Sequence, residues 1–388
     1  MQVDIAIVGG GVMGSALAYW LKRLQPQLSV SVIERDSRYT FASSALSAAS
    51  IRQQFTTPVN IRISQASIEF LRRADEWLST SDEKVDIGLK EAGYLYLANE
   101  MQRPALERAN ALQRAHGAHV ALLDCEQLRA RFGWLNTSQI AAGSLGLSGE
   151  GWFDGYGLLS AFARKARSLG AEFVRGEVVG VTLRADQVCE IELKEGRRIG
   201  CGRLVNAAGA WARAVASLAG VELPVAAHRR TVYVIACPTE IPGLPLLIDP
   251  SGFWIRPEGR LFIAGLPPRE DVDAAPLDPD HEAFESELWP ALAMRIPAFE
   301  AARLERAWAG YYEMNTFDHN GIVGFHPRIR NLLFINGFSG HGMQQSPIVA
   351  RGAAELLTEG RFTTLDLSAL AYTRIPENQP LREANVIG

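Results

Sequence analysis

The chain contains few cysteines and no long apolar run. Only four of its 388 residues are cysteine, and these lie far apart with no paired spacing, at Cys125, Cys189, Cys201 and Cys237. Such spacing argues against a disulfide framework and against a zinc site, and it favours a reducing compartment. No uninterrupted apolar run reaches the ~20 residues that a membrane span requires, so we expect no transmembrane segment. Because a buried-strand pattern begins at Val3, we also expect no signal peptide and interpret the protein as cytoplasmic.

A strong charge of either sign is also absent. The chain has 39 Lys and Arg against 43 Asp and Glu, a formal net charge of −4, and its basic residues are scattered. This balance argues against nucleic acid and against an anionic membrane surface as partners. The histidines, including the close pair His116 and His119, form no pattern typical of metal ligands, and we expect no metal. Length and composition indicate a large soluble enzyme of two lobes that acts on a small molecule.

A glycine-rich turn near the start of the chain is its most informative feature. The turn at residues 9–14 follows an apolar strand pattern at 3–8 and precedes a helical pattern at 12–24. In such a turn Gly9 allows the tight bend, Gly11 lets the backbone approach a pyrophosphate, and Gly14 lets the helix pack closely on the sheet. The helix N-terminus adds unpaired N–H groups and a partial positive charge. The turn therefore predicts a dinucleotide site.

An acidic residue stands where this site needs one. Glu34 ends a second strand pattern at residues 29–33, twenty residues after the glycine turn. Its carboxylate would accept hydrogen bonds from the ribose hydroxyls of adenosine, and it would repel a 2′-phosphate. Glu34 therefore disfavours NADP.

Small residues recur at three later places where a cofactor could come close. These are residues 40–55, residues 206–211 after a strand pattern, and the strand, turn and helix of residues 332–357. An NAD domain would be complete within one stretch of ~150 residues, whereas this one is interrupted by long insertions and completed near the C-terminus. The interruption favours FAD. We predict an α/β fold in which a Rossmann-like FAD-binding domain (residues 1–87, 153–220 and 322–388) carries an inserted mixed-sheet α+β substrate domain (residues 88–152 and 221–321).

Several of these motifs together resemble one family across nearly the whole chain. Gly9-x-Gly11-x-x-Gly14 and the segments 43–55, 206–211 and 337–342 resemble the D-amino-acid oxidase superfamily, on its sarcosine oxidase and dimethylglycine dehydrogenase side. The segments 308–313, 315–321 and 360–362 look most like the FAD-dependent oxidoreductase domain proteins that assist assembly of mitochondrial respiratory complex I. The resemblance implies a GR2-type FAD-binding domain and a C–N bond oxidised by hydride transfer to flavin N5. The product would be an imine that water hydrolyses.

The motifs and the resemblance together name the residues expected to hold FAD. They are Gly9, Gly11, Val12, Met13, Gly14, Glu34, Arg35, Ser43, Ser44, Ser47, Val178, Ala207, Ala208, Gly209, Trp211, Gly337, Gly340, His341, Gly342, Met343 and Gln344. We expect His341 to contact cofactor or substrate rather than to catalyse. Where covalently flavinylated members of the family have a cysteine, this chain has Tyr311, so we expect FAD to be bound non-covalently.

The substrate residues follow from what an amino acid needs. A guanidinium can bind a carboxylate bidentately, and Arg52, which matches the arginine of the family, is our first choice. Arg256 is the second choice and Arg230 a weaker one. Tyr233, Trp254 and Tyr312 could form an aromatic cage for an amine, although core packing explains each of them equally well. Gln344 replaces a lysine that helps hold carboxylate in sarcosine oxidase, which makes a larger amine or a D-amino acid plausible.

The electron acceptor and the activity itself leave alternatives. Sarcosine oxidase has a lysine that activates oxygen where this chain has Ile263. The expectation is therefore a dehydrogenase that passes electrons to a quinone or a flavoprotein, with oxygen as the other possible acceptor. One alternative is a D-amino acid dehydrogenase. Another is a flavoprotein assembly factor with little turnover.

Overall fold

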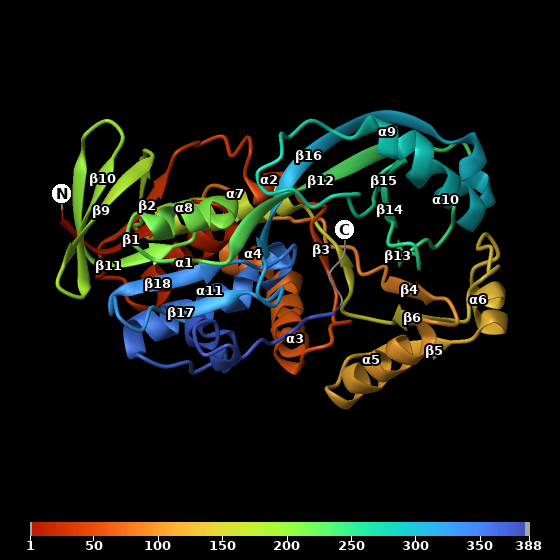
Figure 1. Ribbon diagram of the computed structural model, residues 1–388, viewed down its shortest axis with the longest axis horizontal. Coiled ribbons are helices and arrows are strands. Elements are labelled where there is room, and N and C mark those ends of the chain that lie inside the picture. The colour runs from red at the N-terminus through yellow and green to blue at the C-terminus, as the bar shows by residue number, and fades with distance from the viewer. Residues whose placement is uncertain (1, 385–388) are drawn as a thin grey trace.

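The first sheet is built around the apolar strand β1 (Gln2–Val8) in the computed structural model, which describes residues 2–384 (Figure 1). β1 runs parallel to its two neighbours and is buried, as expected of a parallel strand covered on both faces. In spatial order the strands are β17 (Ile322–Phe325), β18 (Leu332–Asn336), β11 (Arg198–Asn206), β1, β2 (Val30–Glu34) and β8 (Glu172–Arg175), with the hairpin of β9 (Val178–Arg184) and β10 (Gln187–Leu193) paired onto β11.

Helices from distant parts of the chain pack together beside this sheet. α1 (Val12–Leu24) is buried around most of its circumference because it packs between α7 (Gly155–Ser168) and α11 (Gly342–Glu359). α3 (Pro58–Arg72) packs on α11. α3 ends before Arg73, whose φ of −118° leaves the helical region, and the short helix α4 (Ala74–Leu78) follows. Shorter helical turns are η1 (Gly209–Trp211), α8 (Ala212–Ser217), η4 (Ser368–Leu370) and η5 (Tyr372–Arg374).

The second sheet is mixed, because β13 runs parallel to β4 while its other pairs are antiparallel. In spatial order its strands are β16 (Arg303–Asn315), β12 (Val225–Ala236), β15 (Leu261–Gly265), β14 (Trp254–Glu258), β13 (Leu246–Ile248), β4 (Tyr94–Ala98), β6 (Ala142–Gly146) and β5 (Val120–Leu123). The helices of this part are α2 (Ser43–Leu46), near β16, and α5 (Arg103–Ala115), α6 (Cys125–Arg131), α9 (His281–Ala283), η2 (Phe284–Leu288), α10 (Trp289–Arg295) and η3 (Pro297–Ala301). The long strands β12 and β16 reach from this sheet towards the first (Figure 1). This architecture confirms the predicted fold class.

The chain passes between the two sheets several times. Strands of the first sheet fall within residues 2–34, 172–206 and 322–336, and strands of the second fall within 94–146 and 225–315. A small ladder of β3 (Ser50–Ile51) and β7 (Gly151–Trp152) lies at one of these passages. The predicted domain boundaries stay a prediction, and the division of the strands between the two sheets agrees with them. Residues 1 and 385–388 of the predicted FAD-binding domain lie outside the described residues. Between residues 2 and 384, no helix has the length and apolar composition needed to cross a membrane.

Candidate cofactor and active site

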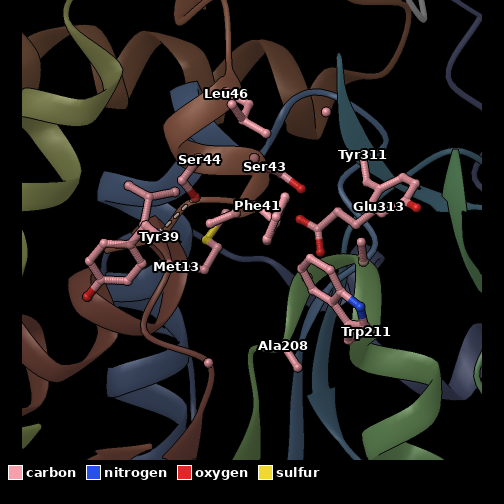
Figure 2. Close-up of a pocket in the computed structure, with 18 of the residues that line it drawn as sticks. Met13, Tyr39, Phe41, Ser43, Ser44, Leu46, Ala208, Trp211, Tyr311 and Glu313 are labelled. Carbon is pink, nitrogen blue, oxygen red and sulfur yellow. Dashed lines mark hydrogen bonds between the residues drawn. The ribbon is translucent and has the colours of Figure 1, made fainter. Parts of the chain in front are cut away.

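A cavity of about 510 Å³ lies where the carboxyl ends of β1 and β2 face the long strands β12 and β16. Its volume falls in the range typical of small-molecule and cofactor sites, about 300–1,000 Å³. Residues of the glycine turn line one part, and the turn before α11 lines another. The cavity therefore joins segments from both ends of the chain, and Figure 2 shows its central part.

The glycine turn is shaped by close backbone contacts. Gly9 has a φ of +102°, and a Cβ on it would lie 2.3 Å from the carbonyl oxygen of Ala207. A Cβ on Gly14 would lie 1.9 Å from the carbonyl oxygen of Gly9, so α1 touches the turn directly. Neither position can accept a side chain without movement of the backbone. Gly9 lines the cavity, whereas Gly14 acts through packing of the helix.

The start of α1 is suited to bind an anion. Its N-cap residue, Gly11, supplies no side-chain cap, so N–H groups of the first turn point outward at the positive end of the helix dipole. The backbone N–H of Val12 donates to Oγ of Ser44 at 3.0 Å, which brings α2 over this helix end. A pyrophosphate fits this donor set.

Glu34 is held rigidly beside this turn. Its Oε2 accepts from the N–H of Gly10 at 2.7 Å, and its Oε1 accepts from the N–H of Asp36 at 2.9 Å. Because a carboxylate oxygen has two acceptor sites, each oxygen keeps one for a ribose hydroxyl. Nearby, the guanidinium of Arg35 lies over the ring of Trp211, with 3.9 Å from Cζ to the ring centroid. The residues present fit the adenosine end of FAD.

The turn before α11 forms the other part of the cavity wall. Gly340 has a φ of +86°, and a Cβ on it would lie 2.4 Å from the ring of Tyr312. Gly342 and Met343 follow at the N-terminus of this long helix and also line the cavity. This helix end offers partial positive charge to a group that becomes anionic on reduction.

Glu313 is a functional candidate that the sequence analysis did not single out. Its carboxylate turns into the cavity between Trp211 and Ser43 (Figure 2), and its Oε2 accepts from the N–H of Gly337 at 3.0 Å. Burial raises the pKa of Glu313 to about 7, against the lowering effect of hydrogen bonds from the backbone of Gly337 and Phe338. The sequence did contain a signal for Glu313, because it is the single acidic residue in the aromatic and apolar strand of residues 308–313.

The structure brings most of the predicted cofactor residues together. Those that line the cavity are Gly9, Gly11, Val12, Met13, Glu34, Arg35, Ser43, Ser44, Ser47, Val178, Ala207, Ala208, Gly209, Trp211, Gly340, Gly342 and Met343. The others lie behind its wall: Gly14, Gly337, His341 and Gln344. Of the predicted substrate residues, Trp254 and Tyr312 line the cavity, as does the weaker candidate Arg230.

Arg52, our first choice for the carboxylate, lies behind the α11 turn rather than in the cavity wall. Its side chain is buried, donates to the carbonyl oxygen of Gln54 at 2.8 Å, and lies 2.9 Å from Nε2 of His341. Its guanidinium covers the ring of Phe55, and Oε1 of Gln344 accepts from its backbone N–H at 3.0 Å. His341 and Gln344 thus hold Arg52 in place, and their expected contact with the cofactor stays a prediction.

A second buried carboxylate braces the Arg52 segment from behind. Oε1 of Glu150 accepts from the N–H groups of Gln53 and Gln54 at 2.6 and 3.1 Å, and its Oε2 accepts from Nε2 of Gln54 at 2.9 Å. Burial raises the pKa of Glu150 to about 7. Glu150 does not line the cavity and is fully buried, whereas Glu313 lines the cavity and is partly exposed to it.

Two further predicted substrate residues, Tyr233 and Arg256, lie outside the cavity wall. Side chains alternate between the faces of a strand, and Tyr233 points to the face of β12 opposite Arg230 and Val232, where it packs on Phe284 and donates to the carbonyl oxygen of Asp280 at 2.5 Å. Arg256 is buried, donates to the carbonyl oxygen of Ala48 at 2.7 Å, and pairs with Glu258. Neither residue lines the cavity.

The lining contains no candidate for covalent attachment through sulfur. Cys125, Cys189, Cys201 and Cys237 are free, and none of them is among the described residues of the cavity wall. Tyr311 does line it, with its hydroxyl donating to the carbonyl oxygen of Ala275 at 2.7 Å. In the part of the chain that the structure describes, no three His, Cys, Asp or Glu side chains are grouped so as to hold a metal ion.

The chain is similar in sequence and in structure to known FAD-dependent oxidoreductases and amino-acid dehydrogenases. The family model described as FAD dependent oxidoreductase (DAO) matches residues 4–356. FAD-dependent oxidoreductase domain-containing protein 1 of Xenopus laevis is 43% identical over 425 residues, which cover 100% of this chain and 85% of that protein. Mitochondrial dimethylglycine dehydrogenase of Homo sapiens is 26% identical over 96% of this chain and 44% of its own length. The crystal structure of L-proline dehydrogenase from P. horikoshii superposes with a TM-score of 0.88 at 26% identity, covering 98% of this chain and 99% of that one.

These similarities confirm the resemblance that the motifs predicted, and they confirm FAD as the cofactor. The family model spans most of the chain, including the glycine turn, both sheets and the turn before α11. The chain therefore belongs to the DAO family of FAD-dependent oxidoreductases.

Proposed function

We propose that this protein oxidises a C–N bond of an amino acid or an N-alkylated amino acid. The observation that carries the proposal is the end of the cavity at β12 and β16, where Arg230, Trp254 and Tyr312 line the wall and the ring of Tyr312 lies close to Gly340 of the α11 turn. This end combines a cation for a carboxylate with aromatic faces for an amine. Bound FAD supplies the chemistry by accepting a hydride at flavin N5, which leaves an imine on the substrate.

Arg230 is our choice for the residue that holds the substrate carboxylate. It is 9% exposed, and its guanidinium lies over the ring of Tyr312 at 5.2 Å from the centroid. Of the described residues that line the cavity, the other one with a permanent cation is Arg35, beside Glu34 at the adenosine end. Arg52 remains a second candidate, because its charge acts on Tyr312 from behind the wall.

Trp254 and Tyr312 would hold the amine and exclude water. Trp254 is 7% exposed and belongs to an apolar cluster with Val232 and Ile263. An uncharged amine is favoured in such surroundings because an ammonium would lose its hydration there. Hydride transfer requires that the amine is neutral and that it is held close to the cofactor.

We also propose that the protein is a dehydrogenase rather than an oxidase. Ile263 is 3% exposed in this apolar cluster and contributes no positive charge to it. A cation would stabilise superoxide as it forms, so its replacement by isoleucine disfavours direct reaction with oxygen. A quinone or another flavoprotein is the acceptor that we propose.

Anaerobic reduction of the FAD-loaded protein tests the activity. Sarcosine, dimethylglycine, other N-alkyl amino acids, L-proline and D-amino acids are each mixed with the protein while the flavin absorption band is recorded. We expect at least one of them to bleach the band, and reoxidation to be faster with a quinone analogue than with air. Bleaching by none of them would refute the C–N oxidation, and rapid reoxidation by air would refute the dehydrogenase preference.

Substitutions of single arginines test which residue binds the substrate carboxylate. Arg230→Met should raise the apparent dissociation constant of a carboxylate substrate about 30-fold or more, the equivalent of at least ~2 kcal/mol for an unpaired desolvated charge. Arg260→Met is the matched control, because Arg260 is an exposed residue at the turn between β14 and β15. If Arg52→Met has this effect and Arg230→Met does not, the carboxylate binds at Arg52.

A further inference from the structure

Arg230 already holds a carboxylate that belongs to its own chain. Nη1 of Arg230 donates to Oδ1 of Asp271 at 2.7 Å, and Nη2 donates to Oδ2 at 3.0 Å. These two parallel hydrogen bonds are the geometry in which arginine binds a free carboxylate. Asp271 therefore occupies the Nη1–Nη2 edge of the guanidinium.

The two partners differ in exposure. The side chain of Arg230 is 9% exposed, whereas that of Asp271 is 41% exposed. Nδ1 of His228 also lies 2.9 Å from Oδ2 of Asp271. Partial burial alone would raise the pKa of Asp271, but its hydrogen bond and charge contacts with Arg230 and His228 lower it. Asp271 is thus an ionised group at the edge of solvent, facing a cation in the cavity wall.

The segment that carries Asp271 is anchored beyond it. This segment, residues 266–280, links β15 to α9 and is largely exposed. Its later part is tied down where Oδ1 of Asp273 accepts from the N–H of Ala227 at 2.8 Å and the carbonyl oxygen of Ala275 accepts from Tyr311 at 2.7 Å. Asp271 lies two residues before the first of these anchors, between the exposed Glu270 and Val272. Its side chain can turn to solvent while the anchored part stays in place.

A substrate carboxylate has an advantage in this exchange. Ion pairs that are open to solvent contribute little free energy, since water solvates the released charge well. A carboxylate bound inside the cavity makes the same forked hydrogen bonds with less competition from water. A substrate carboxylate that binds at the Nη1–Nη2 edge excludes Asp271 from it, because the two carboxylates repel each other and the edge accommodates one of them.

We propose that Asp271 is a resident carboxylate that holds Arg230 until the carboxylate of the substrate displaces it. This inference rests on the proposed function and deepens it by assigning a residue that sets substrate affinity and selectivity. A substrate without a carboxylate leaves the Arg230–Asp271 pair closed. The residue therefore selects carboxylate-bearing amines over simple amines of similar shape.

Binding of an unreactive carboxylate to the FAD-loaded protein tests this. Methoxyacetate has the shape of an N-methyl amino acid but no C–N bond to oxidise, and its binding is followed by the shift of the flavin absorption band. We expect Asp271→Asn to bind it up to about 5-fold more tightly, the equivalent of ~1 kcal/mol for loss of an exposed pair. Asp271→Ala should behave in the same way, and Asp271→Glu, which keeps the carboxylate, should stay close to the wild type.

Matched controls separate this effect from charge and shape. Asp278→Asn removes the same charge from the same segment and keeps the backbone carbonyl oxygen of Asp278, which accepts from Nη1 of Arg229 at 3.1 Å. We expect wild-type affinity. Methoxyacetamide has the same shape without the charge, and its affinity should not improve in Asp271→Asn. Arg230→Met should lose the response to methoxyacetate in every background.

Three outcomes would overturn the inference. The first is equal affinity for methoxyacetate in Asp271→Asn and Asp278→Asn, and the second is weaker binding in Asp271→Asn, which would make Asp271 a support for Arg230. The third is no spectral response to methoxyacetate in any variant that holds FAD. Because the probe is not oxidised, these results are independent of whether any amino acid bleaches the flavin, so the proposed activity and this inference can fail separately.

Discussion

Replacing Glu313 by glutamine should remove a pH dependence from the stability of the protein. Burial raises the pKa of this carboxyl to about 7, against 4.5 for an ordinary glutamate. The stabilising contribution of this group is therefore fully present below about pH 4.5, and it is lost between about pH 4.5 and pH 7, because the carboxyl of the unfolded chain ionises in this range while that of the folded chain stays protonated. Each pKa unit is worth about 1.4 kcal/mol, so ionisation costs about 3 kcal/mol in full. Between about pH 5.5 and pH 8, linkage gives a loss of about 2 kcal/mol.

Urea unfolding of the wild type and of Glu313→Gln at these two pH values measures the loss. Glutamine keeps an acceptor for the N–H of Gly337 but has no charge, so the variant should lack about 2 kcal/mol of the decline seen in the wild type. Glu150→Gln is the matched comparison, because burial also raises the pKa of Glu150 to about 7. Glu150→Gln should likewise lack a decline of similar size in the free energy of unfolding between these two pH values.

FAD binding distinguishes the two glutamates. Glu313 lines the cavity in which we expect the pyrophosphate of FAD to bind, whereas Glu150 does not. Charges of like sign repel, so FAD affinity in the wild type and in Glu150→Gln should fall as the pH rises through about 7. In Glu313→Gln this fall should be absent. The same decline in unfolding free energy in Glu313→Gln as in the wild type would refute the buried ionisation, and the same pH profile of FAD affinity would refute its contact with the cofactor site.

Three more predictions concern the cofactor domain. Gly14→Ala should destabilise the protein by about 1–3 kcal/mol, because its Cβ would lie 1.9 Å from the carbonyl oxygen of Gly9; Gly133→Ala, with open space around its Cβ, is the control, and equal urea midpoints would contradict the packing argument. Glu34→Ala should weaken FAD binding about 10- to 100-fold, since hydrogen bonds to a charged group contribute about 1.5–3 kcal/mol; unchanged affinity by flavin titration would remove Glu34 from the ribose site. Acid precipitation should release all of the FAD, and yellow colour retained in the pellet would show a covalent bond.

The motifs were good predictors where a local pattern has one physical solution. A strand, a glycine turn and a helix in this order form the same anion site wherever they occur, because the geometry is set within a few residues. Gly9, Gly11 and Glu34 accordingly line the cavity. The turn at Gly340–Gly342 was found for the same reason, because it also lies between a strand and a helix.

Side-chain direction on long strands was harder to predict. Tyr233 and Arg230 are close in sequence on β12, but the alternation of the strand places them on opposite faces. Nothing in the local sequence of β12 shows which face is covered by η2 and which faces the cavity. The role of a buried arginine is similarly ambiguous from sequence. Arg52 donates to the carbonyl oxygen of the nearby Gln54, whereas Arg256 donates to that of Ala48, which is distant in sequence.

The amino-acid sequence by itself determined the cofactor class and the fold, because these depend on short-range turn geometry and on the order of strands and helices. Only the tertiary structure decided which charged groups line the cavity and which of them pair with charges outside it. Arg230 comes from β12, Asp271 from an exposed connection forty-one residues later, and Glu313 from β16. Their proximity is produced by pairing of strands that are distant along the chain, and the pKa of Glu313 is set by burial that exists only after both sheets have come together.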